Sequence, residues 1–283
     1  MSLWPKEAKL ALSIVVNVEE GAEASIADGD RGPEPVDELG ISLKKSIRNY
    51  GNESNYQYGI KAGAPRVMDL LERYGIKATF TAAAVALERA PDLAKRISVG
   101  GHEVCAHGHR WVHQFHMDEA SERQFIQSAV ASIEKTMGER PYGWLSRYLL
   151  TENTRRLLAE EGFTYHMDDY SDDLPFWNTD QNIPMVIMPY ALDSNDMKMW
   201  TDPSYSPEAW LKYAVDTFDW LVAEGEAGSP KMMSLGVHLR IIGRPGRIGA
   251  FDAFLSHVTS RDDIWIATRK NIRDRWAQAN PAP

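Results

Sequence analysis

Cysteine is almost absent from this chain, and its single copy, Cys105, excludes an intramolecular disulfide. In a predicted strand this residue is expected to act as a small buried apolar side chain rather than as a nucleophile. Long apolar runs are missing as well, because no stretch approaches the roughly 18 apolar residues of a membrane helix. The first ten residues also lack the apolar segment of a signal peptide. We therefore expect a cytoplasmic protein without a membrane partner.

Positive charge is scarce too. Lys and Arg number 31 against 40 Asp and Glu, which gives a formal net charge of −9. A chain this acidic is not expected to bind nucleic acid or an anionic membrane surface. The partner that we expect is a small-molecule substrate.

The composition that remains is typical of a large globular protein. Hydrophobic residues make up 43% and charged residues 25% of the 283 residues, which suits one α/β domain over 1–283. Strands are expected at 9–16, 77–81, 103–106, 163–167, 185–188, 231–237 and 264–267. Helices are expected at 58–73, 82–97 with a break at Pro91, 118–137, 152–161 with Thr151 as cap, 207–223, 247–258 and 268–277. Seven or eight strand-helix units imply a parallel sheet, most economically in a closed or nearly closed barrel.

Residues 21–58 interrupt this alternation with little periodicity and with many Gly, Asp, Pro, Ser and Asn residues. A loop of this length within a compact domain is usually a lid, a binding loop or an interface segment. We therefore expect the segment to cover a site or to pack against another subunit.

Two predicted strand ends carry side chains suited to acid–base chemistry. The run 101–116 contains five of the eight histidines, and His107 follows the strand 103–106 directly. Glu19 and Glu20 follow the strand 9–16, with Asn17 just upstream. In strand-helix folds such positions line the site. Other polar or aromatic candidates after strands are Trp144, Arg147, Asp193, Asn195, His238 and Arg240.

These positions resemble the signature of the polysaccharide deacetylases, whose fold is a distorted (β/α)7-type barrel related to the TIM barrel. In that family the first strand ends in paired aspartates, a base and a metal ligand, where this chain has Glu19 and Glu20. The family's His-(Ser/Thr)-x-x-His motif supplies two further metal ligands. His107 fills its first position, and Trp111 stands at the second.

Within the family, the chain is most similar to the metal-independent allantoinases, which hydrolyse the hydantoin ring of allantoin. The matching segments are 17–23, 101–111, 140–144, 153–157, 172–177, 192–197 and 236–247. Two departures concern positions near the expected substrate. The allantoinase run Trp-Tyr-Thr-Gly-Arg is replaced by residues 144–148, and His109 stands where an aromatic residue is usual. Another cyclic amide or imide, or a linear amide, therefore stays open as substrate.

The resemblance raises the question of a metal. A catalytic Zn²⁺ needs about three protein ligands and one open position. Because Trp111 cannot ligate, we expect no cofactor. The alternative is a divalent cation such as Zn²⁺ held by Glu20, His107 and a displaced histidine, His109 or His113, which have the motif's four-residue separation.

Hydrolysis of an amide without a metal needs a base, an acid and donors for the tetrahedral oxyanion. Glu19 or Glu20 is the expected base, with mutual repulsion raising one pKa, and His107 or His238 the acid or oxyanion donor. The predicted substrate-binding residues are Asn17, Trp111, Trp144, Arg147, Asp193, Asn195 and Arg240.

Three functions follow from this set of residues. The first is metal-independent ring opening of a cyclic amide, ureide or imide such as allantoin. The second is metal-dependent deacetylation of an N-acetylated saccharide, and the third is a binding protein without catalysis. The relatives also imply a homo-oligomer such as a tetramer.

Overall fold

A computed structural model of the chain describes residues 2–38, 40–41, 45–179 and 183–283. Its sheet is organised around β1 (Leu10–Val18), a nine-residue strand that is buried throughout. β1 pairs in parallel with β8 (Lys231–His238) along most of its length. Its other edge is shared by β9 (Ile264–Ile266) near the start and by β2 (Thr79–Ala82) near the end. A parallel strand that is buried on both faces reads as a near-continuous apolar run, as this sequence does.

The remaining strands extend the sheet in the order β6-β7-β5-β4-β3-β2-β1-β8. Their bounds are β3 (Glu103–Ala106), β4 (Gly143–Trp144), β5 (Tyr165–His166), β6 (Phe176–Asn178) and β7 (Met185–Ile187). Among the strands that the structure describes, only β6 and β7 pair in the antiparallel direction, and β6 is an edge strand that the sequence analysis missed. A parallel bridge also joins Asn195, which follows β7, to Gly236 of β8. The fold is therefore α/β with a curled, barrel-related sheet, as expected.

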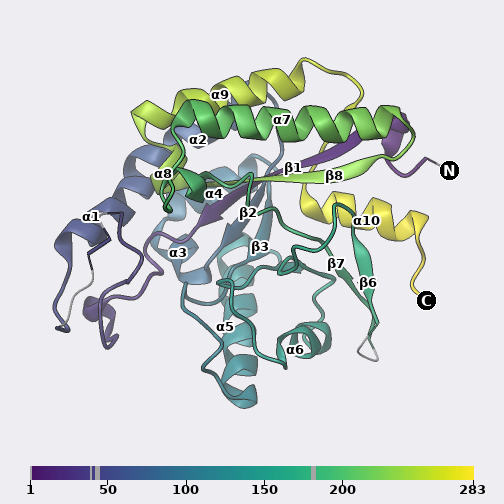
Figure 1. Cartoon of the computed structure of the whole chain (residues 1–283). Coiled ribbons are helices and arrows are strands. Elements are labelled where there is room, and N and C mark those ends of the chain that lie inside the picture. Colours follow the sequence, from purple (N-terminus) through teal and green to yellow (C-terminus); the bar gives the residue numbers. More distant parts are fainter. Residues whose placement is uncertain (1, 39, 42–44, 180–182) are drawn as a thin grey trace.

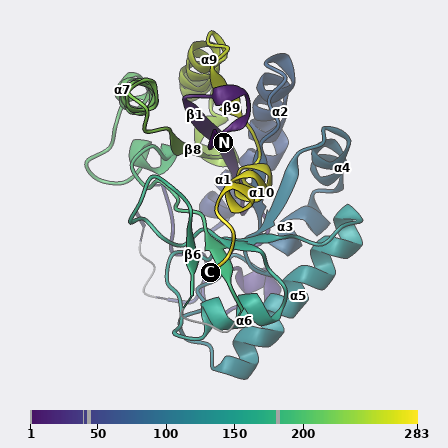
Figure 2. The ribbon, with the colours of Figure 1, turned by 90° about the vertical axis from the view of Figure 1, so that its right-hand side faces the viewer.

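Helices flank this sheet (Figures 1 and 2). They are α1 (Tyr50–Tyr58), α2 (Ala64–Arg73), α3 (Ala84–Arg89), α4 (Pro91–Val99), α5 (Glu119–Met137), α6 (Thr154–Glu160), α7 (Pro207–Glu226), α8 (Leu239–Ile242), α9 (Pro245–Thr259) and α10 (Arg269–Ala279). The long helices α7 and α9 pack against each other above β1 and β8, while α5 and α6 lie below (Figure 1). No helix within the described ranges is long and apolar enough to cross a membrane.

Local sequence signals fixed several helix ends. Pro91 separates α3 from α4 as expected. The Asp118 side chain caps α5 by accepting from the backbone N–H of Ser121, and Gly138 ends that helix in the left-handed conformation. The prediction that Thr151 caps a helix from residue 152 was wrong. There α6 begins later, at Thr154, after Asn153.

The segment expected as a loop over 21–58 is only partly irregular. It contains a short 3-10 helix at Ile26–Asp28, and its last residues form α1. From α1 the chain continues through a π-helical turn at Gly59–Gly63 into α2. The helix predicted from residue 58 therefore starts eight residues earlier.

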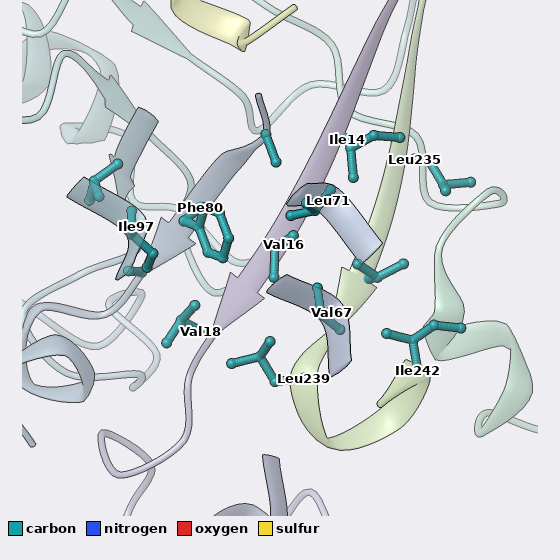
Figure 3. Packing of buried hydrophobic residues seen from close by; sticks show 14 of the residues in the cluster. Ile14, Val16, Val18, Val67, Leu71, Phe80, Ile97, Leu235, Leu239 and Ile242 are labelled. Atoms are coloured by element: carbon teal, nitrogen blue, oxygen red, sulfur yellow. The ribbon is translucent and has the colours of Figure 1, made fainter. Parts of the chain in front are cut away.

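Alternation along the strands divides the core into two faces. Ile14, Val16 and Val18 of β1 point toward Val67 and Leu71 of α2, on the helix-covered face (Figure 3). Their odd-numbered neighbours Ala11 and Val15 belong to a second cluster on the opposite face. Because successive side chains of a strand point to opposite faces, the odd-numbered positions lead to Asn17 and then Glu19 at the end of β1. The same alternation carries Cys105 of β3, buried as expected, on to His107.

Candidate active site

Glu19 lies at the centre of a buried polar cluster at the C-terminal ends of β1, β3 and β8. Its Oε1 is 3.5 Å from Nε2 of His107 and 3.3 Å from Nε2 of His238. Its Oε2 accepts a hydrogen bond of 2.6 Å from Nη1 of Arg240. The carboxylate is 2% exposed. Four side chains named from the sequence are thus brought into contact by the curling of the sheet.

His238 is held as a cation. Its Nδ1 donates a 2.6 Å hydrogen bond to Oδ1 of Asp196, whose Oδ2 also accepts from the backbone N–H of His238 and of Ile242. Burial alone would lower the pKa of His238, but the carboxylates of Glu19 and Asp196 raise it to about 9. At neutral pH the imidazolium therefore carries a proton on Nε2, directed at Glu19.

His107 is held in the opposite state. Its Nδ1 lies 2.7 Å from the carbonyl oxygen of Leu145, which can only accept, so Nδ1 carries a proton. The indole N–H of Trp111 lies 3.2 Å from Nε2, and an indole can only donate. Nε2 must therefore present its lone pair to Trp111. These two partners define a neutral imidazole with its proton on Nδ1.

Arg240 links the carboxylates to a group of aromatic rings. It is fully buried, and its guanidinium lies 4.4 Å from the ring centroid of Tyr56, 5.3 Å from that of Trp111 and 5.4 Å from that of Trp200. Nη1 binds Glu19, but Nε and Nη2 have no hydrogen-bond partner. Buried donors of this kind are costly unless a ligand or water meets them. The cluster therefore has two donor nitrogens available for an oxygen of a bound molecule.

The pKa values of the two adjacent glutamates are shifted in opposite directions. Burial alone would raise the pKa of Glu19, yet Arg240 and His238 hold it well below its usual range. Burial raises the pKa of Glu20 against the effect of Arg240, and the charge of Glu19 adds to the rise. The expectation that one of the pair has a raised pKa is confirmed for Glu20, with burial rather than repulsion as the larger cause.

Glu20 is also enclosed by backbone. Its Oε1 accepts from the N–H of Arg240 at 3.0 Å, and its Oε2 from the N–H of Glu19 at 3.1 Å. A Cβ at Gly59 would lie only 2.5 Å from Oε1, so the π-helical turn packs directly against this carboxylate. Glu19, by contrast, lies between the two histidines and Arg240.

Two described residues of segment 21–58 lie next to the cluster, Tyr56 against Arg240 and Glu34 against Arg147. Glu34 forms a buried bidentate pair with Arg147, with N–O distances of 2.5 and 2.9 Å. The guanidinium of Arg147 lies 3.7 Å from the ring centroid of Trp111 and donates to the Trp111 carbonyl. Arg147 is thus near the site, but its charge is paired.

Two predicted substrate-binding residues lie away from the cluster. Trp144 belongs to the helix-covered core, where its ring packs edge-on against Phe125 and Phe163. Successive side chains of a strand point to opposite faces, so Trp144 and Leu145 cannot both point toward the site. Leu145 is the one in the second core cluster, on the face of the sheet that leads to Glu19 and His107. Asp193 is exposed and accepts a 2.6 Å hydrogen bond from the hydroxyl of Tyr213 on α7.

Asn17 and Asn195 lie beneath the cluster as part of its support. The Nδ2 of Asn17 donates to the Tyr190 hydroxyl and to the Val237 carbonyl, and its Oδ1 accepts from Thr81. Asn195 donates to the same Tyr190 hydroxyl. The side-chain amides of both residues are hydrogen-bonded within the protein. These residues therefore hold neighbouring strands in position and are not available to bind a ligand.

The ligand positions implied for a metal do not fit one here. The His107 lone pair that would ligate is taken by the Trp111 N–H. The displaced histidines do not replace it, since His113 Nδ1 lies 3.2 Å from the Arg147 carbonyl and His109 is half-buried beside Arg110. Over the residues with described positions, no three His, Cys, Asp or Glu side chains form a group suited to a metal ion.

Comparisons with known proteins agree with this architecture. Residues 54–166 match the family model of polysaccharide deacetylases. A protein of Schizosaccharomyces pombe (strain 972) named as a polysaccharide deacetylase is 32% identical over 299 residues, covering 98% of this chain and 93% of its own. The chain belongs to the polysaccharide deacetylase family.

Two solved structures of the family share the whole fold. A polysaccharide deacetylase-type protein of Pseudomonas aeruginosa PAO1 is 38% identical with a TM-score of 0.94, covering 99% of this chain and 95% of that one. Puue allantoinase is 39% identical with a TM-score of 0.94, covering 99% and 94%. Membership in this family makes the chain a hydrolase that acts on carbon–nitrogen bonds.

The sequence analysis did not name four residues of this site: Tyr56, Glu34, Asp196 and Trp200. Asp196 lies in the segment 192–197, which the sequence analysis matched to the family. The analysis chose Asp193 from that segment as a site residue, whereas Asp196 is the aspartate that contacts the cluster. For Glu34 and Tyr56 the signal was only the unusual length of the segment that contains them.

Proposed function

We propose that this chain opens a ring by hydrolysing a cyclic amide bond, as in a ureide or imide such as allantoin, without a metal ion. The observation that carries the proposal is the Trp111 N–H on the free nitrogen of His107, at the position where the family's second metal ligand would stand. The likeness to Puue allantoinase over nearly the whole chain supports a ring ureide as the substrate.

In this proposal Glu19 is the base. It is ionised at neutral pH, and it accepts a proton from the water whose oxygen attacks the carbonyl carbon. The unpaired Nε–H and Nη2–H of Arg240 donate to the carbonyl oxygen as it becomes an oxyanion. The positive charges that depress the pKa of Glu19 thus also face the developing negative charge.

His238 is the acid. Its pKa of about 9 keeps it protonated at neutral pH, so Nε2–H can transfer a proton to the ring nitrogen as the carbon–nitrogen bond breaks. The products are a carboxylic acid, which ionises, and the freed N–H group. A ring amide or imide is more electrophilic than the N-acetyl group of a sugar, which makes the loss of a Lewis acid tolerable.

The test is a substrate panel on protein of measured metal content. We would assay allantoin, hydantoin, succinimide and chitooligosaccharides before and after chelation, with metal quantified by mass spectrometry. Turnover of a ring compound that persists after chelation is the expected result. Chelator-sensitive release of acetate from chitooligosaccharides would instead establish a metal-dependent deacetylase, and tight binding of a ring without turnover a binding protein.

A further inference from the structure

A buried ion pair next to the cluster has no role in the reaction as proposed. Glu34 and Arg147 are 4% and 8% exposed, and two parallel N–H···O bonds join them. Bidentate pairs between arginine and a carboxylate are the geometry with which proteins recognise carboxylate ligands. Here the chain's own side chain takes the place of such a ligand.

Arg147 is close enough to the reacting groups for its charge to matter there. Its guanidinium lies 3.7 Å from the centroid of the Trp111 ring, and that of Arg240 lies 5.3 Å from the same centroid. The N–H of that ring is bound to His107, which in turn lies 3.5 Å from Glu19. Arg147 is thus one aromatic ring away from the histidine.

Ring opening changes the charge of the bound molecule. Water adds to the carbonyl carbon, the carbon–nitrogen bond breaks, and the new carboxyl group loses its proton. The product of a neutral ring therefore carries a negative charge that the substrate lacks. An unpaired arginine beside the site would bind this product more tightly than the ring and would slow its release.

We propose that Glu34 is a specificity-determining residue, which occupies Arg147 so that the site favours a neutral ring over the open-chain carboxylate made from it. This inference rests on the proposed ring opening for its biological meaning. The charge selection itself is a property of binding, and it can be measured whether or not a given ring is turned over.

The experiment compares two ligands of matched skeleton by calorimetry: hydantoin, a neutral ring, and N-carbamoylglycine, the carboxylate that its hydrolysis yields. They are titrated into the wild-type chain and into Glu34→Gln, which removes the charge but keeps the shape. We expect N-carbamoylglycine to bind the variant at least about tenfold more tightly than wild type, with hydantoin affinity changed less than threefold.

Two further variants separate charge selection from a loosened segment. Asp30→Asn breaks another ion pair of segment 21–58, the one with Arg110 at 2.7 and 2.8 Å, and should leave both affinities unchanged. Glu34→Gln combined with Arg147→Met should lose the gain, because the cation is then absent. Melting temperatures confirm that each variant is folded.

The opposite results would overturn the inference. They are the same gain in Asp30→Asn, persistence of the gain in the double variant, or no stronger binding of N-carbamoylglycine to Glu34→Gln. A failure of the proposed function would look different, since it would appear as no turnover of any ring compound while the charge dependence of binding remained.

Discussion

Two histidines flank the same carboxylate oxygen of Glu19, one at the end of β3 and one at the end of β8, and they are prepared for opposite roles. His238 has Asp196 behind it and is cationic. His107 has a carbonyl on one nitrogen and an indole N–H on the other, and so is neutral. The distances to Glu19 are nearly equal, at 3.3 and 3.5 Å. The partner on the far side of each ring therefore decides what the ring can do.

This difference also separates the two halves of the site in function. In the proposed reaction the β8 half, with His238 and Arg240, supplies a proton and positive charge. The β3 half contains His107 and Trp111. His107 is neutral, and its Nε2, the nitrogen that could bind a metal, already accepts a hydrogen bond from Trp111. A histidine is the side chain most sensitive to such surroundings, because its ordinary pKa lies near neutrality.

The largest effect is expected from the carboxylate that both halves share. Glu19→Gln should lower kcat/KM for a ring substrate about 10³-fold, within the range of 10²–10⁴ for a general base. Steady-state kinetics on the folded variant would measure this loss. Asp193→Asn serves as the control, because Asp193 is exposed and bound to Tyr213, and its loss should change kcat/KM less than twofold. Full activity of Glu19→Gln would refute the assignment of the base.

The cationic half is tested through its pH dependence. In wild type, kcat/KM should fall on the alkaline side with a pKa of about 9 as His238 loses its proton. Asp196→Asn removes one of the two charges that raise this pKa, so the alkaline limb should move to lower pH. We expect kcat/KM near neutrality to fall about 10²-fold as the acid is lost. A limb that stays near pH 9 in this variant would mean that another group titrates.

The neutral half is expected to give the smallest effect. Trp111→Phe keeps a ring beneath Arg147 but removes the N–H, leaving the buried Nε2 of His107 without a donor. The free energy of unfolding should fall by about 1–3 kcal/mol, measured by urea denaturation, and activity should drop by about tenfold or less. Nitrogen NMR of the imidazole should show the wild-type proton on Nδ1. A proton on Nε2 in wild type would contradict the hydrogen-bond assignment.

Much of the fold could be predicted from local patterns. The buried run of β1, the boundaries of β3 and the break at Pro91 all depend on neighbouring residues, so they are visible in sequence. The antiparallel edge strand β6 was missed. Its pairing with β7 decides its conformation.

The site residues also divide into those that local sequence indicates and those that depend on tertiary structure. Glu19, Glu20, His107 and His238 follow apolar strands, and the rule that strand ends meet at one face was enough to group them. Trp144 and Leu145 are adjacent, and only one of them can point inward, yet the sequence favoured the wrong one because tryptophan is the more usual pocket residue. The alternation of side chains between the two faces, which places Glu19 and His107 on the same face, could have shown which residue of the pair points inward. Applying it to β4, a strand of two residues, requires knowing the register of that strand in the sheet.

The sequence by itself determined most of the strands, though not β6, and the residue types that end them, because periodicity and strand ends are local properties. The tertiary structure alone decided the state of each group. Asp196 charges His238 from 42 residues away, Glu34 pairs with Arg147 across 113 residues, and Arg240 meets Glu19 across 221. Protonation, tautomer and available charge depend on what lies within a few ångströms in space, and the closing of the sheet brings those partners together.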